Sequence, residues 1–150
     1  EYRLPKAVID QEVSIIEQIG VTIKYGVKLG EDITIQDLQS NYDASFLALG
    51  AWKASSMRTD GEFLPGVMGG IDFLREVAEG KTVDLGDEVV VVGGGNTAMD
   101  VARTALRLGV KDVKVLYRRT ESEMPAQDIE IHEAKEEGIP VAVYNSSVNT

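Results

Sequence analysis

The sequence has 150 residues, of which 43% are hydrophobic and 27% are charged, as in a globular domain with its own apolar core. Its net charge of −10 argues against a nucleic-acid partner, because binding to phosphate backbones needs a basic surface. The lack of cysteine excludes disulfides, thiolate metal sites and iron–sulfur ligands within this sequence. No apolar run approaches 18 residues, so we expect a cytoplasmic chain without a membrane partner.

The first 50 residues predict two helices and two strands. Pro5 suits the first turn of a helix, and apolar residues follow at helical spacing as far as Ile19. The run 21–25 predicts a short strand, and Thr34 predicts the N-cap of a short helix with a capping-box pattern. Residues 42–50 are typical of a buried strand that ends in a glycine turn.

Helices and strands alternate in the rest of the sequence, which predicts a parallel α/β sheet. Residues 51–70 contain several breakers and predict a connector. Trp52 in this connector would either pack at a domain junction or fill the core, and we favour the core. The predicted order after it is a helix over 72–79, a strand over 89–92, a helix ending at Gly109, a strand over 113–117, a helix over 127–137 and a strand over 139–144.

A glycine-rich turn, Gly-Gly-Gly-Asn-Thr-Ala starting at Gly93, joins the valine strand to the next helix. Gly93 permits the chain to leave the strand abruptly, Gly95 lets the main chain approach a pyrophosphate, and Ala98 keeps the helix close to the strand. The free N–H groups at the helix start, with side-chain donors from Asn96 and Thr97, would face the diphosphate. The alternative is that three glycines merely end a strand. The Gly-x-Gly-x-x-Ala spacing between strand and helix favours dinucleotide binding.

Two arginines, Arg118 and Arg119, follow the second strand of this strand–helix–strand unit. An NAD site usually has an acid there, about 20 residues after the glycines, to bind the ribose 2′-hydroxyl. A guanidinium instead offers a charged donor fork for a 2′-phosphate. The alternative is a solvated surface pair. Position and chemistry together predict NADP(H) as the cofactor.

Several motifs in one order carry a family resemblance. They are Arg3-Leu-Pro-Lys6, Leu47-Ala-Leu-Gly-Ala-Trp52, Gly70-Ile-Asp-Phe-Leu-Arg-Glu76, Gly93 to Asp100, Thr104-Ala-Leu-Arg-Leu-Gly109 and Tyr117-Arg-Arg…Met124-Pro-Ala126. With them the sequence resembles the small (beta) subunit of NADPH-dependent glutamate synthase and its relatives. Those include the flavin half of dihydropyrimidine dehydrogenase and the large subunit of NADH-dependent ferredoxin:NADP oxidoreductase.

The resemblance implies an FAD/NAD(P)-binding, Rossmann-like oxidoreductase. NADPH would pass hydride to FAD, and electrons would continue to iron–sulfur clusters in another region or a partner subunit. Residues 1–65 would be a partial FAD-domain segment with a connector, and 66–150 the first part of an NADP domain, in a fragment of a longer chain. The family's FAD fingerprint would precede Glu1, so the fragment alone is expected to be inactive. Arg3, the backbone near Leu29, and the Leu49–Gly50 turn would lie at FAD. The positions that match the family's contacts with NADP are Gly94, Gly95, Asn96, Thr97, Arg118 and Arg119.

No side chain needs to be a catalytic acid, base or nucleophile, because the cofactors carry the hydride chemistry. We expect no metal site, a surface position for His132, and a solvated face for the carboxylates of 128–137. The Met124-Pro-Ala126 loop either closes over the adenosine or is an ordinary turn. Two other functions stay open: a nucleotide-binding regulatory module without redox chemistry, and a scaffold whose glycines are only structural.

Overall fold

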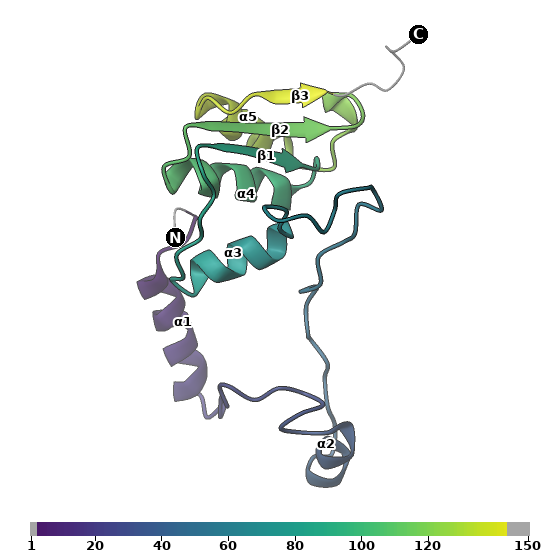
Figure 1. The fold of residues 1–150 in the computed structure, drawn as a ribbon. Helices are drawn as coiled ribbons and strands as arrows, with labels where there is room; N and C mark the ends of the chain where they lie inside the picture. The colour runs from purple at the N-terminus through teal and green to yellow at the C-terminus, as the bar shows by residue number, and fades with distance from the viewer. Residues whose placement is uncertain (1–2, 144–150) are drawn as a thin grey trace. The chain divides into compact units, whose positions relative to one another are not determined.

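The computed structural model describes residues 3–143, and the chain divides into two compact units, up to Ala51 and from Trp52 onward. The first unit contains helices α1 (Lys6–Gln18) and α2 (Ile35–Asn41), labelled in Figure 1. A capping box starts α2: Thr34 Oγ1 accepts the Asp37 N–H at 3.1 Å, and Asp37 Oδ2 accepts the Thr34 N–H at 2.9 Å. Both helices agree with the sequence prediction.

The two strands predicted in this unit were wrong. Residues 21–25 and 42–50 are irregular, and the strand-like pairing described within the unit is a single bridge between Leu29 and Ile33. A strand forms only where a neighbour takes up its N–H and C=O groups, and an apolar run alone supplies none. Phe46 is accordingly 93% exposed instead of buried.

The second unit begins with an irregular segment over 52–69 and continues with regular α/β structure. Trp52, for which a core position was favoured, is 63% exposed: it lies in this irregular segment and is not among the residues that form the hydrophobic core. The elements that follow are α3 (Gly70–Ala78), β1 (Glu88–Val92), α4 (Asn96–Arg107), β2 (Asp112–Tyr117), the 3₁₀ helix η1 (Glu121–Glu123), α5 (Asp128–Glu136) and β3 (Val141–Val143). Each helix and strand predicted after residue 70 is present.

The three strands form a parallel sheet in the order β1-β2-β3, with α4 running along it (Figure 1). Val92 pairs with Leu116 and Val115 with Val141, so the strands end at a common edge. This arrangement confirms the predicted α/β fold with a parallel sheet and flanking helices.

The core lies between one face of the sheet and helices α4 and α5. Val91, Val113 and Val115 are buried on this face, whereas Val90 is 60% exposed on the other. Small residues on α4 let it approach the strands closely, and Met99 fills the remaining space with no exposed surface. The alanines that line the helix are Ala98, Ala102 and Ala105.

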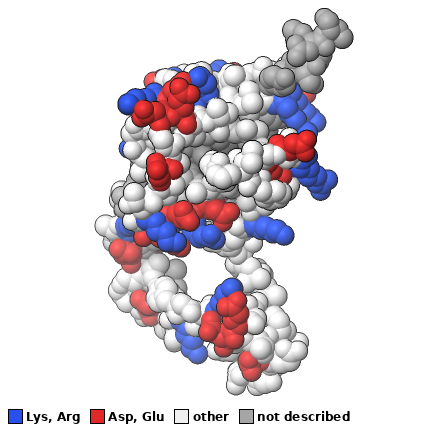
Figure 2. Space-filling model, in the orientation of Figure 1, with Lys and Arg blue, Asp and Glu red and all other residues white. Residues whose placement is uncertain are grey.

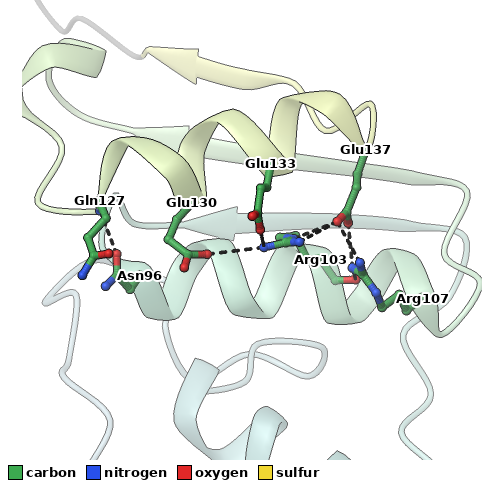
Figure 3. A network of polar contacts seen from close by, with 7 residues as sticks. All are labelled: Asn96, Arg103, Arg107, Gln127, Glu130, Glu133 and Glu137. Atoms are coloured by element: carbon green, nitrogen blue, oxygen red, sulfur yellow. Dashed lines mark hydrogen bonds and ion pairs between the residues drawn. The ribbon is translucent and has the colours of Figure 1, made fainter. Parts of the chain in front are cut away.

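An ion-pair network centred on the buried Arg103 joins α4 to α5 (Figure 3). The Arg103 side chain is 7% exposed, and its guanidinium lies 2.6 Å from Glu133, 2.7 Å from Glu137 and 3.3 Å from Glu130. Arg107 contacts the same Glu137 carboxylate at 2.6 Å. The predicted solvated face was therefore wrong for Glu130 and Glu137, whereas the Glu133 side chain is 41% exposed. The helical spacing of the three glutamates puts them on the side of α5 that meets α4.

Replacing Arg103 with alanine should lower the free energy of unfolding by about 3 kcal/mol, because the buried Glu130 carboxylate would lose a cationic partner. Urea unfolding at pH 7 measures the change. Lys114→Ala is the matched control, since the Lys114–Asp112 pair is half exposed and should contribute less than about 1 kcal/mol. Equal effects of the two substitutions would contradict a special role for the buried network.

The same network predicts a pH dependence of stability. Hydrogen bonds from Arg107, reinforced by Arg103, lower the pKa of Glu137 from 4.5 to about 2 in the folded chain. Because the folded pKa is depressed, this stabilisation is present above about pH 4.5 and is lost as the pH falls toward 2. Glu137→Gln should be less stable than the unmodified chain at pH 7, and the difference should shrink between these pH values in urea unfolding. A difference independent of pH would contradict the assignment.

Candidate functional site

The glycine turn and the arginine pair lie at the common edge where β1 and β2 end. Gly93 follows β1 directly, and its N–H donates to the Leu116 carbonyl of β2 at 3.0 Å. Its φ of 148° is a conformation that side chains rarely adopt, and a Cβ there would lie 3.3 Å from the Ala98 Cβ. These contacts agree with the predicted jobs of Gly93 and Ala98: a sharp exit from the strand and close packing of the helix.

Gly94 is buried against the ring of Tyr117, a contact that sequence reasoning missed. A Cβ on Gly94 would lie 2.6 Å from two ring carbons of Tyr117. The ring is held at its other end, because the Tyr117 hydroxyl donates to the Glu123 carbonyl at 3.0 Å. Gly94 is thus needed for packing inside the protein.

Gly95 and the first residues of α4 face open space. A Cβ on Gly95 would meet no atom within 4 Å, and its φ of −92° suits any residue. The N–H groups of Gly95, Asn96 and Thr97 donate to no acceptor in the described part of the chain, and no side chain caps α4. Unpaired N–H groups at the positive end of a helix are suited to an anion such as a diphosphate.

Arg118 and Arg119 come directly after β2 and are exposed. Neither guanidinium has a carboxylate within ion-pair distance among residues 3–143. A capping box joins Thr120 and Glu123 just after them. Hydrogen bonds from Thr120 are the main cause of the lowered Glu123 pKa, to which Arg119 adds a smaller effect. Both arginines therefore carry charge that the described structure leaves without a direct counter-ion.

The segment 124–127 packs onto the glycine turn. The Ala126 N–H donates to the Gly94 carbonyl at 3.0 Å, and the Gln127 N–H donates to Asn96 Oδ1 at 2.9 Å (Figure 3). Met124 and Ala126 are buried. The loop is therefore part of the wall beside the turn, while its contact with an adenosine stays a prediction. The sequence predicted Asn96 only as a donor to phosphate. The structure shows that its Oδ1 also accepts the Gln127 N–H.

The residues predicted to lie at FAD belong to the first unit. Arg3 is exposed ahead of α1, Leu29 forms the bridge with Ile33, and Leu49 is 60% exposed next to Gly50. They come from three separate segments of that unit. Their contact with a flavin stays a prediction.

Within residues 3–143, no group of three or more His, Asp or Glu side chains is arranged to hold a metal ion, and none of the helices combines the length and apolar character that a membrane span requires. The His132 side chain is 66% exposed beside Glu136, as predicted for a surface residue. Figure 2 shows acidic and basic side chains interspersed on the face in view, without an extended basic area.

A model of the pyridine nucleotide-disulphide oxidoreductase family matches residues 8–149. The chain belongs to this family. The resemblance deduced from the sequence motifs is confirmed, and the predicted cofactors, NADP(H) and FAD, are those of the family. Homology thus places the chain in a family of pyridine-nucleotide oxidoreductases.

Three relatives in the family illustrate its range. NADPH-Fe(3+) oxidoreductase subunit beta of Geobacter sulfurreducens is 44% identical over 141 residues, covering 92% of this chain and 21% of that protein. NADP(+)-dependent formate dehydrogenase subunit beta of Moorella thermoacetica is 42% identical over 99% of this chain and 21% of its own length. The glutamate synthase [NADPH] small chain of Escherichia coli is 36% identical over 92% of this chain and 32% of its own length. The chain thus spans about a fifth to a third of these relatives.

Alanine substitutions should affect stability differently at Gly94, which packs against a side chain, and at Gly95, which faces open space. Gly94→Ala should lower the free energy of unfolding by about 1–3 kcal/mol, because the new methyl group would overlap the anchored Tyr117 ring. Gly95→Ala should lower it by less than about 1 kcal/mol, because its methyl group would meet no atom and only the N-cap preference for glycine over alanine is lost. Thermal or urea unfolding measures both. A strongly destabilising Gly95→Ala would show that the open space is filled in solution.

Proposed function

We propose that this family member is part of an NADPH-dependent flavin oxidoreductase and that its second unit binds NADP(H) on the glycine turn. The proposal depends on two groups that lie together at the ends of the paired parallel strands β1 and β2. These groups are the open N–H groups at the start of α4 and the two arginines without direct counter-ions. This is the edge of an α/β sheet where dinucleotides bind.

The turn fits a diphosphate. The N–H groups of Gly95, Asn96 and Thr97 would donate to its oxygens, and the positive end of α4 would favour its charge. The open space over Gly95 lets phosphate oxygens approach the main chain, which a side chain would obstruct.

The arginine pair fits the 2′-phosphate that distinguishes NADP(H) from NAD(H). Each guanidinium is a planar donor that stays charged at neutral pH and can form paired hydrogen bonds with phosphate. No acid that would repel this phosphate stands directly after β2. The names of all three relatives above include NADPH or NADP(+), which supports the same nucleotide here.

When bound, NADPH supplies a hydride and FAD accepts it, while the chain's own residues bind and orient these groups. Arg3, the backbone near Leu29 and the Leu49–Gly50 turn are proposed to contact FAD. We place the boundary between the FAD segment and the NADP domain near residue 65.

The relatives are named as a beta subunit or small chain, which supports a partner subunit. We propose that an iron–sulfur region or partner receives the electrons, and that the isolated chain is inactive.

A regulatory module that only senses the nucleotide would use the same turn and arginines. Flavin separates the two functions: purification of the complete protein with the visible absorbance of FAD supports the oxidoreductase. A colourless protein that still binds NADPH would support the sensor.

Alanine in place of Arg118 or Arg119 should weaken NADPH binding about ten- to hundredfold and leave NADH binding nearly unchanged. A charged hydrogen bond contributes about 1.5–3 kcal/mol, and NADH lacks the phosphate that receives it. Isothermal titration calorimetry with each nucleotide measures the two dissociation constants.

Gly95→Ala is the matched control, because its methyl group would lie under the diphosphate that both nucleotides share. It should weaken NADPH and NADH to a similar extent. Equal losses of both nucleotides in the arginine variants would overturn the assignment of the 2′-phosphate. Absence of NADPH binding at millimolar concentration would overturn the site.

A further inference from the structure

Two hydrogen bonds join the loop that carries the arginines to the glycine turn, and one of them is made by a side chain. Asn96, the first residue of α4, accepts the Gln127 N–H at 2.9 Å, across 31 positions in sequence (Figure 3). Figure 3 shows the two residues pointing toward one another from the starts of α4 and α5. A neighbouring bond from the Ala126 N–H to the Gly94 carbonyl joins two backbone groups. Of these two bonds, only the one to Asn96 depends on a side chain.

Further contacts order the loop, residues 118–127, between the arginines and Gln127. The Thr120–Glu123 capping box closes its middle, and the Tyr117 hydroxyl binds the Glu123 carbonyl. Lys135 of α5 pairs with Glu121 at 2.6 Å. The start of the loop, which carries the arginines, is continuous with β2, and its end is held at Asn96.

We propose that Asn96 is a positioning residue for nucleotide specificity. By accepting the Gln127 N–H it holds the loop against the turn, and so fixes where Arg118 and Arg119 present their donors. The proposal rests on the proposed binding of NADP(H) at this site. The further claim is that Asn96, which lies beside the proposed diphosphate site, affects the preference for NADPH over NADH. Arginines on a fixed loop lose less conformational freedom when they bind the 2′-phosphate.

This role differs in its consequences from a direct bond between Asn96 and the diphosphate. NADPH and NADH share the diphosphate, so loss of a direct bond weakens both equally. Loss of the loop restraint weakens NADPH alone. The ratio of the two dissociation constants therefore distinguishes positioning from direct contact.

Gln127→Pro tests the proposal, because proline removes the N–H and leaves the Asn96 side chain intact. The φ of −66° at Gln127 already suits a proline ring. In the full chain we expect NADPH to bind about three- to tenfold more weakly, as for the loss of one hydrogen bond, with NADH within twofold of its original affinity. Hydrogen exchange of the Ala126 amide should become faster.

Two control substitutions test whether the effect of Gln127→Pro comes from the loss of the glutamine side chain or from the introduction of a proline near the start of α5. Gln127→Ala removes the same side chain but keeps the N–H, so the nucleotide preference should remain. Asp128→Pro introduces proline one residue later, at the first position of α5, where it is favoured, and should also keep the preference. The ψ of 141° at Gln127 suits a residue that precedes proline.

Asn96→Ala removes the acceptor and provides a second route should Gln127→Pro not fold. Its loss of preference should match that of Gln127→Pro, and the double variant should lose no more than either one, as expected for partners in one bond. Equal weakening of both nucleotides, additive losses, or an unchanged ratio in Gln127→Pro would overturn the positioning role. If the unmodified chain showed no preference for NADPH, the assignment of the arginines would fail first and this inference with it.

Discussion

Parallel pairing of β1 with β2 is the constraint on which the site depends. The register that sets Val92 beside Leu116 makes both strands end at one edge, and the Gly93 N–H continues the pairing into the turn. The chain must then leave β1 into α4 and leave β2 into the arginine loop from adjacent points. Two chemical groups well separated in sequence are thereby brought together by backbone hydrogen bonds, before any ligand contributes.

The second constraint is the packing of α4 against α5, which is secured at both ends. Near the C-terminal end of α4, Arg103 and Arg107 hold Glu137, just beyond the end of α5. At the opposite end, Asn96 holds Gln127, which precedes α5. Alanines between them allow close approach. The buried network therefore supports the arginine loop indirectly, since it fixes the helix to which the end of that loop is joined.

Sequence reasoning succeeded where a signal is local and periodic. The alternation after residue 70, the capping box at Thr34 and the glycine turn each depend on neighbouring residues. It failed for 21–25 and 42–50, since a strand depends on a partner that an apolar pattern does not reveal. The Gly94–Tyr117 packing and the Asn96–Gln127 bond join residues distant in sequence and became visible only in three dimensions. The spacing of Glu130, Glu133 and Glu137 was a usable signal for a partner on α4, but it was interpreted as a solvated face.

Binding of a polyanion by a chain of net charge −10 requires that short-range donors outweigh the overall field. At physiological ionic strength, charges more than about 8 Å away are largely screened, so distant carboxylates contribute little. What remains at the proposed site is local: open N–H groups at the start of α4 and two guanidinium groups without direct counter-ions. Such donors bind phosphate only when they lie at hydrogen-bond distance and point toward its oxygens. A chain that cannot attract its nucleotide by overall charge must therefore hold its donors in place, which is the task we assign to the turn, the loop and the bond between them.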